Sequence, residues 1–454
     1  MIKLTFYGGA QEVTGSCFLL ESVKTKILVD CGMWQGGAKD DKKNRAPFDF
    51  NPAEIAAIFA THAHLDHIGR IPFLIKSGFK GKIYSSAPTR ELSEISLKDA
   101  LGLLERSGKS DSEKTEEKTF FEQKDLDEAL KLWSDLNYNQ ELKVGDFKIM
   151  SRDAGHILGS SMYEITAGGK KIVVTGDLGN PPAPLLRPTY IIEDADYLVM
   201  EGIYGNRRHE GKAERRLKLE RTIEDAIKAG GVLIVPAFSL ERTQELLFEL
   251  NDLAENGRIP ETPVFVDSPL AIKMTEIYKK YEEYFNKETA YLISSGDDIF
   301  KFPGLRFTFT TEESKSINDA PPPKIIIAGS GMSTGGRILH HERRYLPDPK
   351  SVLLIIGFQS AGSLGRRLLE GVKNIQIFKE QIQVRAKIVS ISGYSAHPDY
   401  DGLFRFAENS ADTLKKVFVA PAEPQAALFL VQRLRDYLGI EAIAPKYGDS
   451  FELK

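Results

Sequence analysis

Cysteines, long apolar segments and excess positive charge are all scarce in this sequence. Only Cys17 and Cys31 occur in 454 residues, which excludes a disulfide framework and a cysteine-rich zinc site. No segment approaches the roughly 20 apolar residues of a membrane-spanning helix, and the N-terminal residues alternate like a strand and lack a signal-peptide pattern. The net charge of −4 argues against a uniformly basic surface, although a local basic groove is compatible with it. We therefore expect a cytoplasmic protein that does not bind membranes.

The length and the pattern of the sequence predict more than one folding unit. A chain of 454 residues is too long for one ordinary core, so we expect two domains or one domain with a large insertion. After residue 207, helical segments alternate with continuous apolar strands, which predicts a parallel sheet covered on both faces. These expected strands are 231–237, 264–267, 324–328 and 351–356. The C-terminal piece is too small to bury its own core, and we expect it to complete the N-terminal domain.

The strongest local signal is the segment His62-Ala63-His64-Leu65-Asp66-His67, which holds three of the eight histidines. Imidazole and carboxylate groups are ligands that zinc accepts. The apolar run 55–60 predicts a buried strand before the segment, and 71–75 predicts the start of a helix after it. The segment is therefore predicted to be a strand-to-helix loop whose side chains converge on one point. The alternative, a solvated polar loop, fits so rare a pattern poorly.

Three further residues have positions that suit a metal site. Asp30 follows the expected strand 26–29 and either caps a turn or orients a metal-bound imidazole. His156 and Asp177 each lie beside a buried strand and a glycine. Each is weak evidence alone, because a lone histidine is usually structural and Gly-Asp is usually a turn. Together they are what a two-metal site needs to complete the cluster at 62–67.

These residues, in this order, resemble the metallo-β-lactamase superfamily, and more narrowly the short prokaryotic form of its β-CASP branch. That branch contains RNA-processing nucleases such as the pre-mRNA 3′-end cleavage endonuclease and ribonuclease J. The four superfamily motifs fall at Asp30, 62–67, His156 and Asp177. The first two β-CASP motifs fall at Glu201 and at His397, within Ser-Ala-His. The match covers nearly the whole chain.

The resemblance implies an α/β fold, an αββα metallo-β-lactamase sandwich with an inserted parallel-sheet β-CASP domain. The implied limits are 1–200 for the first part of the sandwich, 201–379 for the insertion and 380–454 for the C-terminal part.

The resemblance also implies two zinc ions. Asp177 bridges them in this arrangement; the other ligands are His62, His64 and His156 for the first zinc and Asp66 and His67 for the second. Asp30 and Asp66 orient imidazole and nucleophile respectively. Glu201 beside His397 makes chemical sense as an acid pair, since a carboxylate raises the pKa of an imidazole and keeps it protonated for the leaving oxygen. A helix cap or surface acid is the alternative role for Glu201.

The sequence departs from the family at its third β-CASP motif, which normally supplies a histidine to the second zinc. After the expected strand 417–419, Pro421 occupies that position if Glu423-Pro424 holds the register. A proline side chain has no donor atom, and no histidine follows His397. Glu423 or water substitutes, or the second metal binds weakly or not at all.

Contacts to a substrate are less well marked. Ser395 is a candidate to hold the scissile phosphate. The glycine-rich loop from 329 to 337, which contains Gly331 and Arg337, is a candidate to offer backbone N–H groups to a phosphate. Such loops occur equally for packing reasons. Arg366 is a candidate for RNA backbone contacts, with ordinary surface charge as the alternative.

These features favour a zinc-dependent ribonuclease that cleaves single-stranded RNA in processing or decay, chiefly as an endonuclease, with 5′-exonuclease activity left open. One alternative is a catalytically weakened family member that serves as an RNA-binding or scaffold subunit, as the missing histidine allows. Another is a metallohydrolase of a small ester, which needs neither Glu201, His397 nor the large insertion. The expected partner is RNA, and a homodimer is left open.

Overall fold

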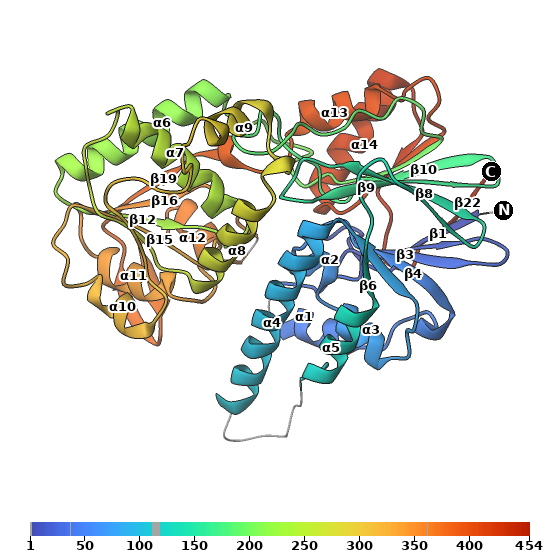
Figure 1. Cartoon of the computed structure of the whole chain (residues 1–454), viewed down its shortest axis with the longest axis horizontal. Coiled ribbons are helices and arrows are strands. Elements are labelled where there is room, and N and C mark those ends of the chain that lie inside the picture. The colour runs from blue at the N-terminus through green and yellow to red at the C-terminus, as the bar shows by residue number, and fades with distance from the viewer. Residues whose placement is uncertain (1, 37, 111–118, 361) are drawn as a thin grey trace. The chain divides into compact units, whose positions relative to one another are not determined.

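The computed structural model describes residues 2–36, 38–110, 119–360 and 362–454. The chain forms two compact units (Figure 1). The first unit comprises Met1–Pro181, Arg187–Arg208 and His397–Lys454, and the second comprises Pro182–Leu186 and His209–Ala396. Among the described residues, no helix is long and apolar enough to cross a membrane.

The first unit is built on two seven-stranded sheets in the described part of the chain. One has the order β22 (Ser450–Leu453), β1 (Ile2–Phe6), β2 (Phe18–Glu21), β3 (Lys26–Val29), β4 (Ile55–Phe59), β5 (Lys82–Ser85) and β6 (Trp133–Asp135). The other has the order β21 (Ala442–Ile443), β20 (Lys416–Val419), β11 (Tyr197–Met200), β10 (Lys170–Val174), β9 (Ser161–Ala167), β8 (Phe147–Asp153) and β7 (Glu141–Val144).

Helices cover the outer face of each sheet (Figure 1). The first sheet carries α1 (Ala38–Arg45), α2 (Leu65–Ile68), α3 (Ile71–Lys76), α4 (Ala87–Ser110) and α5 (Gln123–Leu132). The second sheet carries α13 (Tyr400–Glu408) and α14 (Pro424–Leu438). Leu430 and Leu434 of α14 are buried in one apolar cluster with Val173 and Val417 of the strands. The predicted αββα sandwich is confirmed.

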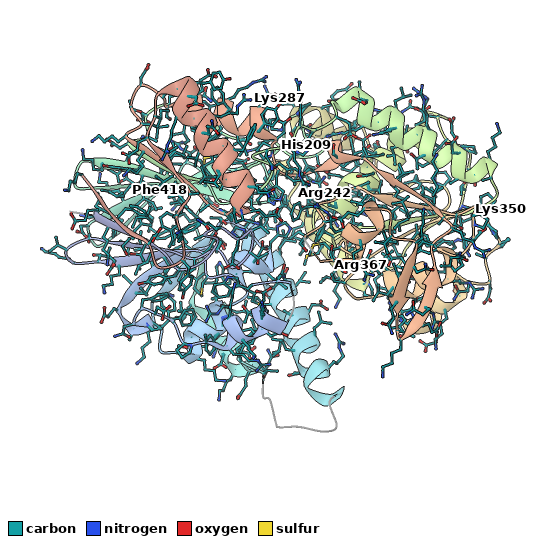
Figure 2. The ribbon with its side chains drawn as sticks, turned by 180° about the vertical axis from the view of Figure 1, so that it is seen from behind. His209, Arg242, Lys287, Lys350, Arg367 and Phe418 are labelled. Carbon is teal, nitrogen blue, oxygen red and sulfur yellow. The ribbon has the colours of Figure 1, made fainter. Side chains whose placement is uncertain are left out.

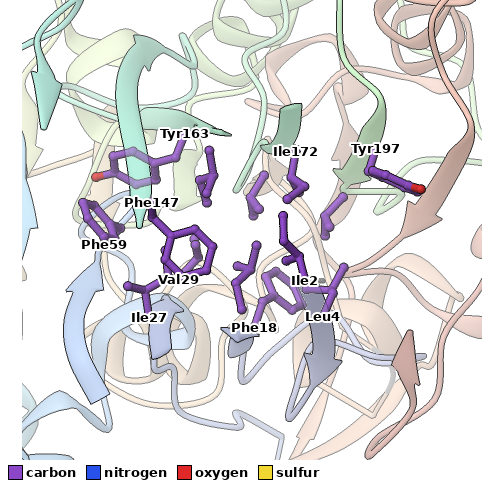
Figure 3. Close-up of a cluster of buried hydrophobic side chains, with 14 of the residues drawn as sticks. Ile2, Leu4, Phe18, Ile27, Val29, Phe59, Phe147, Tyr163, Ile172 and Tyr197 are labelled. Atoms are coloured by element: carbon purple, nitrogen blue, oxygen red, sulfur yellow. The ribbon is translucent and has the colours of Figure 1, made fainter. Parts of the chain in front are cut away.

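The core between the two sheets joins the two ends of the chain (Figure 3). Phe418 of β20 (Figure 2) lies 5.5 Å, between ring centroids, from Phe6 of β1, and Phe6 packs edge-on against Phe18 at 5.4 Å. The final strand β22 pairs with β1, and β20 pairs with β11. The C-terminal segment therefore completes the N-terminal unit, as the sequence predicts.

The second unit contains a six-stranded sheet whose described strand pairs are all parallel. Its order is β14 (Leu305–Phe307), β13 (Val264–Val266), β15 (Lys324–Ala328), β12 (Val232–Pro236), β16 (Val352–Ile355) and β19 (Lys387–Ser390). The helices are α6 (Lys212–Lys228), α7 (Arg242–Glu255), α8 (Pro269–Lys280), α9 (Lys287–Ser294), α10 (Thr311–Ser316), α11 (Ile338–Tyr345) and α12 (Leu364–Leu369). A separate hairpin pairs β17 (Asn374–Ile377) with β18 (Glu380–Gln383).

The four strands expected in the inserted region correspond to β12, β13, β15 and β16. Of the two edge strands of the sheet, β19 coincides with the strand-like segment expected at 388–391, whereas β14 has no counterpart in the expected set. Because β19 pairs with β16, the second compact unit continues to Ala396. The expected domain limits at 201 and 379 stay predictions.

A buried carboxyl group lies on α11 in the second unit. The Oε1 atom of Glu342 accepts a hydrogen bond from Ser333 Oγ at 2.5 Å, whereas its Oε2 has no hydrogen-bond partner among the described residues. Burial raises the pKa of Glu342 from its ordinary value of 4.5 to about 7. The folded protein therefore keeps this proton at pH values at which the unfolded chain has lost it.

We expect the second unit to lose stability as the pH rises from 4.5 to about 7, because folding then opposes the ionisation of Glu342. A shift of this size corresponds to about 3 kcal/mol of unfolding free energy. Denaturant unfolding at several pH values should show that Glu342→Gln removes this dependence. Glu370→Gln, which changes an exposed acid, is the control. Equal pH dependence in wild type and Glu342→Gln would contradict the prediction.

Candidate metal centre

Parallel strands bring the predicted site residues to one edge of the first unit. Strand β3 pairs in parallel with β4, and β10 pairs in parallel with β11, so the carboxyl ends of paired strands lie together. Asp30 follows β3, the 61–67 segment follows β4, Asp177 follows β10 and Glu201 follows β11. The position of each functional side chain is thus set by the end of a buried strand.

The 62–67 segment differs from the predicted loop in one respect. Residues 65–68 form a single helical turn, α2, and His64 is its N-cap. The turn begins immediately after the second histidine, so His62 and His64 still precede any helix. Gly176 has a φ of 56°, and an added Cβ there would lie 2.6 Å from Thr61 Cβ. A glycine before Asp177 therefore allows the end of β10 to approach this segment closely.

Four donor groups converge in this region. His62, His64, His156 and Asp177 each offer one ligand atom, and these atoms all lie within 4.8 Å of one another. Asp177 Oδ2 is 3.5 Å from His62 Nε2 and 3.6 Å from His156 Nε2. His62 Nε2 lies 3.0 Å from His64 Nδ1. Among these groups His62, His156 and Asp177 are buried.

The spacing of these atoms fits a divalent ion. A tetrahedral ion with bonds of about 2.0–2.2 Å separates its ligand atoms by roughly 3.4 Å. The contacts from Asp177 to the two imidazoles are close to that separation and long for hydrogen bonds. Two buried imidazoles and a buried carboxylate, with the half-buried His64 beside them, are costly to bring together in the absence of a partner charge. The donor set is therefore chemically suited to zinc.

A second group of donors shares Asp177. His67 Nε2 lies 3.3 Å from Asp177 Oδ1 and 3.9 Å from Asp66 Oδ2. Burial raises the pKa of Asp66 to about 6. Burial opposes the ionisation of Asp177, but the charges of His67 and His62 hold the pKa of Asp177 well below its ordinary value. This carboxylate thus lies between both groups of donors.

Pro421 lies beside the acid pair, with its carbonyl accepting a hydrogen bond from Gly202 N at 2.8 Å. Glu423 is the N-cap of α14. The structure holds two groups of possible metal ligands among its described residues: His62, His64, His156 and Asp177, and Asp177, Glu201 and His397. Substitution of the expected histidine by Glu423 or by water stays a prediction.

Asp30 contacts the Nδ1 side of the His67 ring, and Thr61 holds Asp30 in place. The sequence analysis did not assign a role to Thr61. Asp30 Oδ2 lies 2.7 Å from His67 Nδ1 and accepts a hydrogen bond from Thr61 Oγ1 at 2.9 Å. Thr61 N donates to Asp30 Oδ1 at 2.8 Å. Burial opposes protonation of His67, but Asp177 and Asp30 raise its pKa well above its ordinary value. Thr61 directly precedes the histidine cluster, which is the only signal for it in the sequence.

Glu201 and His397, the residues predicted to act as an acid pair, lie in contact, and the role itself stays a prediction. His397 Nδ1 lies 3.1 Å from Glu201 Oε1, which also accepts a hydrogen bond from Leu178 N at 2.7 Å. Burial raises the pKa of Glu201. Burial works against protonation of His397, but the Glu201 carboxylate raises the pKa of that imidazole above its ordinary value. The rings of His397 and His156 are 4.6 Å apart, so the pair adjoins the histidine cluster.

The four predicted substrate contacts belong to the second unit. Arg337 donates to Asp267 Oδ1 at 2.7 Å and to Phe309 O at 2.9 Å. Arg366 donates to Glu370 one helical turn away. The carbonyl of Gly331 accepts from Gln359 Nε2 at 2.8 Å, and Ser395 is buried. These contacts lie within the second unit, and roles in binding RNA stay predictions.

Comparisons with known proteins agree with this architecture. Residues 19–181 match the metallo-beta-lactamase superfamily domain, residues 243–368 the Beta-Casp domain and residues 381–445 the Zn-dependent metallo-hydrolase RNA specificity domain. Ribonuclease TTHA0252 of Thermus thermophilus is 36% identical over 99% of both chains. The chain belongs to the β-CASP branch of the metallo-β-lactamase superfamily. Membership implies that the cluster of histidines and Asp177 binds a divalent metal.

Three further proteins are similar over nearly the whole chain. The RNase J-like protein of Methanocaldococcus jannaschii is 32% identical over 99% of both chains. The transcription termination factor FttA of Thermococcus kodakarensis is 30% identical and covers 100% of this chain, which corresponds to 72% of that protein. A crystal structure of a protein of unknown function from Enterococcus faecalis V583 aligns over 100% of both chains with a TM-score of 0.56 at 15% identity. This last similarity shows the fold alone.

We expect Asp30→Asn to weaken metal binding by 10- to 100-fold, because the amide no longer fixes the charge and orientation of His67 as the carboxylate does. Competition with a chelating dye measures the affinity. Asp146→Asn, which changes an exposed carboxylate bonded to Ser22, is the matched control and should bind metal like the wild type. An unchanged affinity in Asp30→Asn would show that Asp30 does not support a ligand.

Proposed function

We propose that this protein is a zinc-dependent ribonuclease that hydrolyses phosphodiester bonds of single-stranded RNA in processing or decay. The observation that carries the proposal is the contact between the Glu201–His397 pair and the donor cluster of His62, His64, His156 and Asp177. A metal centre alone suits many hydrolases, whereas a buried acid pair beside it suits a leaving group that needs a proton. The similarity to a protein named as a ribonuclease supports the same conclusion.

In this proposal His62, His64, His156 and Asp177 hold the first zinc. Asp66, His67 and Asp177 hold the second, which the absence of a donor at Pro421 makes the weaker site. Bound there, the ions supply a nucleophilic water at neutral pH and neutralise the charge on the phosphodiester. Asp30 fixes the ring of His67, and Thr61 fixes Asp30.

The remaining roles belong to the chain's own acids and bases. Asp66 orients the attacking water through its carboxylate. His397 gives a proton from Nε2 to the leaving oxygen, while Glu201 holds Nδ1 on the opposite side of the ring. The short bond from Leu178 N keeps the Glu201 carboxylate in place. Removing either member of the pair therefore affects the proton transfer and leaves the metal ligands intact.

Substrate contacts complete the proposal. Ser395 lies two positions before His397 and has a hydroxyl suited to the scissile phosphate. Gly331, Arg337 and Arg366 supply further contacts to the RNA backbone. Cleavage is chiefly endonucleolytic, takes place in the cytoplasm and is compatible with a homodimer.

One observation favours a second function. Pro421, whose side chain has no donor atom, stands where the family normally has a histidine. A member with an incomplete second site can serve as an RNA-binding subunit with little cleavage. Retention of both acid-pair residues argues for the enzyme, because a subunit that only binds RNA has no use for a proton donor.

The test combines RNA cleavage with metal analysis on the same protein. We expect labelled single-stranded RNA to be cleaved, cleavage to stop after chelation, and added zinc to restore it. His397→Ala should lower kcat by about 10²–10⁴-fold, the contribution of a general acid, with metal content unchanged. His340→Ala, which removes a histidine of the second unit, is the control. Loss of metal in His397→Ala would refute its role as proton donor, and absence of cleavage with intact RNA binding would support the second function.

Pro421→His tests the incomplete second site. The substitution supplies the imidazole that the family normally has, so we expect more zinc per chain, measured by mass spectrometry under native conditions, and a higher cleavage rate. Pro421→Ala has no new donor and serves as the control. If Pro421→His changes neither the zinc content nor the rate, position 421 does not face the second metal.

A further inference from the structure

The two helices outside the second sheet carry several aromatic side chains that are at least partly exposed, and one of them, Phe404, also packs against the core. On α14, Phe429, Arg433 and Tyr437 are four residues apart and form one stripe, and Tyr400 and Phe404 form the facing stripe of α13. We call these five residues the α13–α14 aromatic surface. The opposite side of α14 already fills the core with Leu430 and Leu434. This surface therefore exists in addition to the apolar face that holds the helix in place.

The rings of this surface are arranged around a guanidinium group. Arg433 lies 4.7 Å from the ring centroid of Tyr400, 5.1 Å from that of Phe404 and 5.7 Å from that of Tyr437. Phe429 lies 5.8 Å from Tyr400 between ring centroids. Tyr437 is 74% exposed and Phe429 is 43% exposed. Ordered rings with free faces are the arrangement on which planar groups stack.

Residues of the same unit connect the α13–α14 aromatic surface with the acid pair, through the buried ring of Tyr204. The ring of Tyr204 lies 6.2 Å from that of His397, and the guanidinium of Arg207 lies 5.9 Å from the ring of Tyr204. Tyr400 N in turn donates a hydrogen bond to Arg207 O at 3.1 Å. Aromatic and arginine side chains thus follow one another from the proposed proton donor to the outer face of α13 and α14.

The charges along this path suit a polyanion. Arg207 and Arg208 are exposed where the chain approaches α13. Asp401 is shared between Arg208 at 3.6 Å and Arg433 at 3.1 Å, so one carboxylate faces two guanidinium groups. Arg207, Arg208 and Arg433 thus bring three guanidinium groups near the exposed rings, two of them sharing one aspartate. Aromatic platforms with interspersed arginine bind single-stranded nucleic acid by base stacking and by contacts to phosphate.

We propose that the α13–α14 aromatic surface binds a single-stranded stretch of the RNA substrate beyond the cleaved bond, with bases stacked on Tyr437 and Phe429 and phosphates near Arg207 and Arg208. The proposal rests on the proposed ribonuclease function. A double-stranded RNA hides its base faces and would not use the rings. The surface lies within residues 381–445, the segment that matches the RNA specificity domain.

The test uses the metal-loaded full chain and a single-stranded RNA of about 20 nucleotides, long enough to cover a stacking surface. For Tyr437→Ala and Phe429→Ala we expect KM to rise about ten-fold, the effect of one stacked base, with kcat within about two-fold of wild type. Tyr437→Phe keeps the ring and should restore the wild-type KM. Tyr291→Ala is the matched control, because Tyr291 is 73% exposed and belongs to the second unit. The RNA dissociation constant is measured by fluorescence anisotropy with a chelator present, so that the RNA is not cleaved. It should rise in the two alanine variants of the surface and stay at the wild-type value in Tyr437→Phe and Tyr291→Ala.

The outcomes separate this surface from the ribonuclease function itself. If the wild type cleaves RNA and both alanine variants keep its KM and its RNA dissociation constant, the proposed role of the surface is wrong and the ribonuclease function stands. A wild type that neither binds nor cleaves RNA overturns both. Binding without cleavage, with the expected loss in Tyr437→Ala, supports the surface while the nuclease fails. A change in oligomeric state in Tyr437→Ala, measured by sedimentation, with unaltered RNA affinity overturns the proposal and makes the surface an interface between copies of the chain.

Discussion

A buried carboxylate among imidazoles is the constraint on which the first unit depends. Asp177 lies 3.3–3.6 Å from ring nitrogens of His67, His62 and His156. In water these groups would separate and be hydrated, because burying polar and charged groups together is costly unless each has a partner. Two sheets, their shared core and the helices outside them hold the groups in place. A divalent ion is the partner that best compensates their desolvation.

The same sandwich joins parts of the chain that are far apart in sequence. Glu201 and His397 are 196 positions apart, yet their side chains are 3.1 Å apart. The intervening residues from His209 to Ala396 belong to the second compact unit, and the hydrogen bond from Tyr400 N to Arg207 O connects the segments on either side of it. An independently folded insertion with its own parallel sheet allows so long a loop to be closed without leaving its residues disordered. The acid pair can therefore be split between the two ends of an insertion.

The proposed two-metal centre is not symmetrical in its supply of donors. In that proposal four groups serve the first metal, whereas Asp66, His67 and the shared Asp177 serve the second, and Pro421 contributes none. The hydrogen bonds of Asp30 with Thr61 and of Asp30 with His67 stiffen this poorer side. Orientation by neighbouring groups raises the affinity of the ligands that remain. The ring of His67 is therefore held in a fixed orientation by Asp30, which Thr61 holds in turn.

The sequence by itself determined the family, the α/β class, the sandwich and the parallel sheet of the insertion. These features follow from the order of motifs and from continuous apolar strands, which are local properties of the chain. The edge strand β14 was not predicted, because a strand of only three residues carries a weak apolar pattern. Only the tertiary structure decided that Thr61 holds Asp30, that residues 65–68 form a helical turn, and that aromatic rings of α13 and α14 surround Arg433. The contacts of Thr61 and of Arg433 join side chains from different elements, and such contacts produce no periodic pattern in a single sequence.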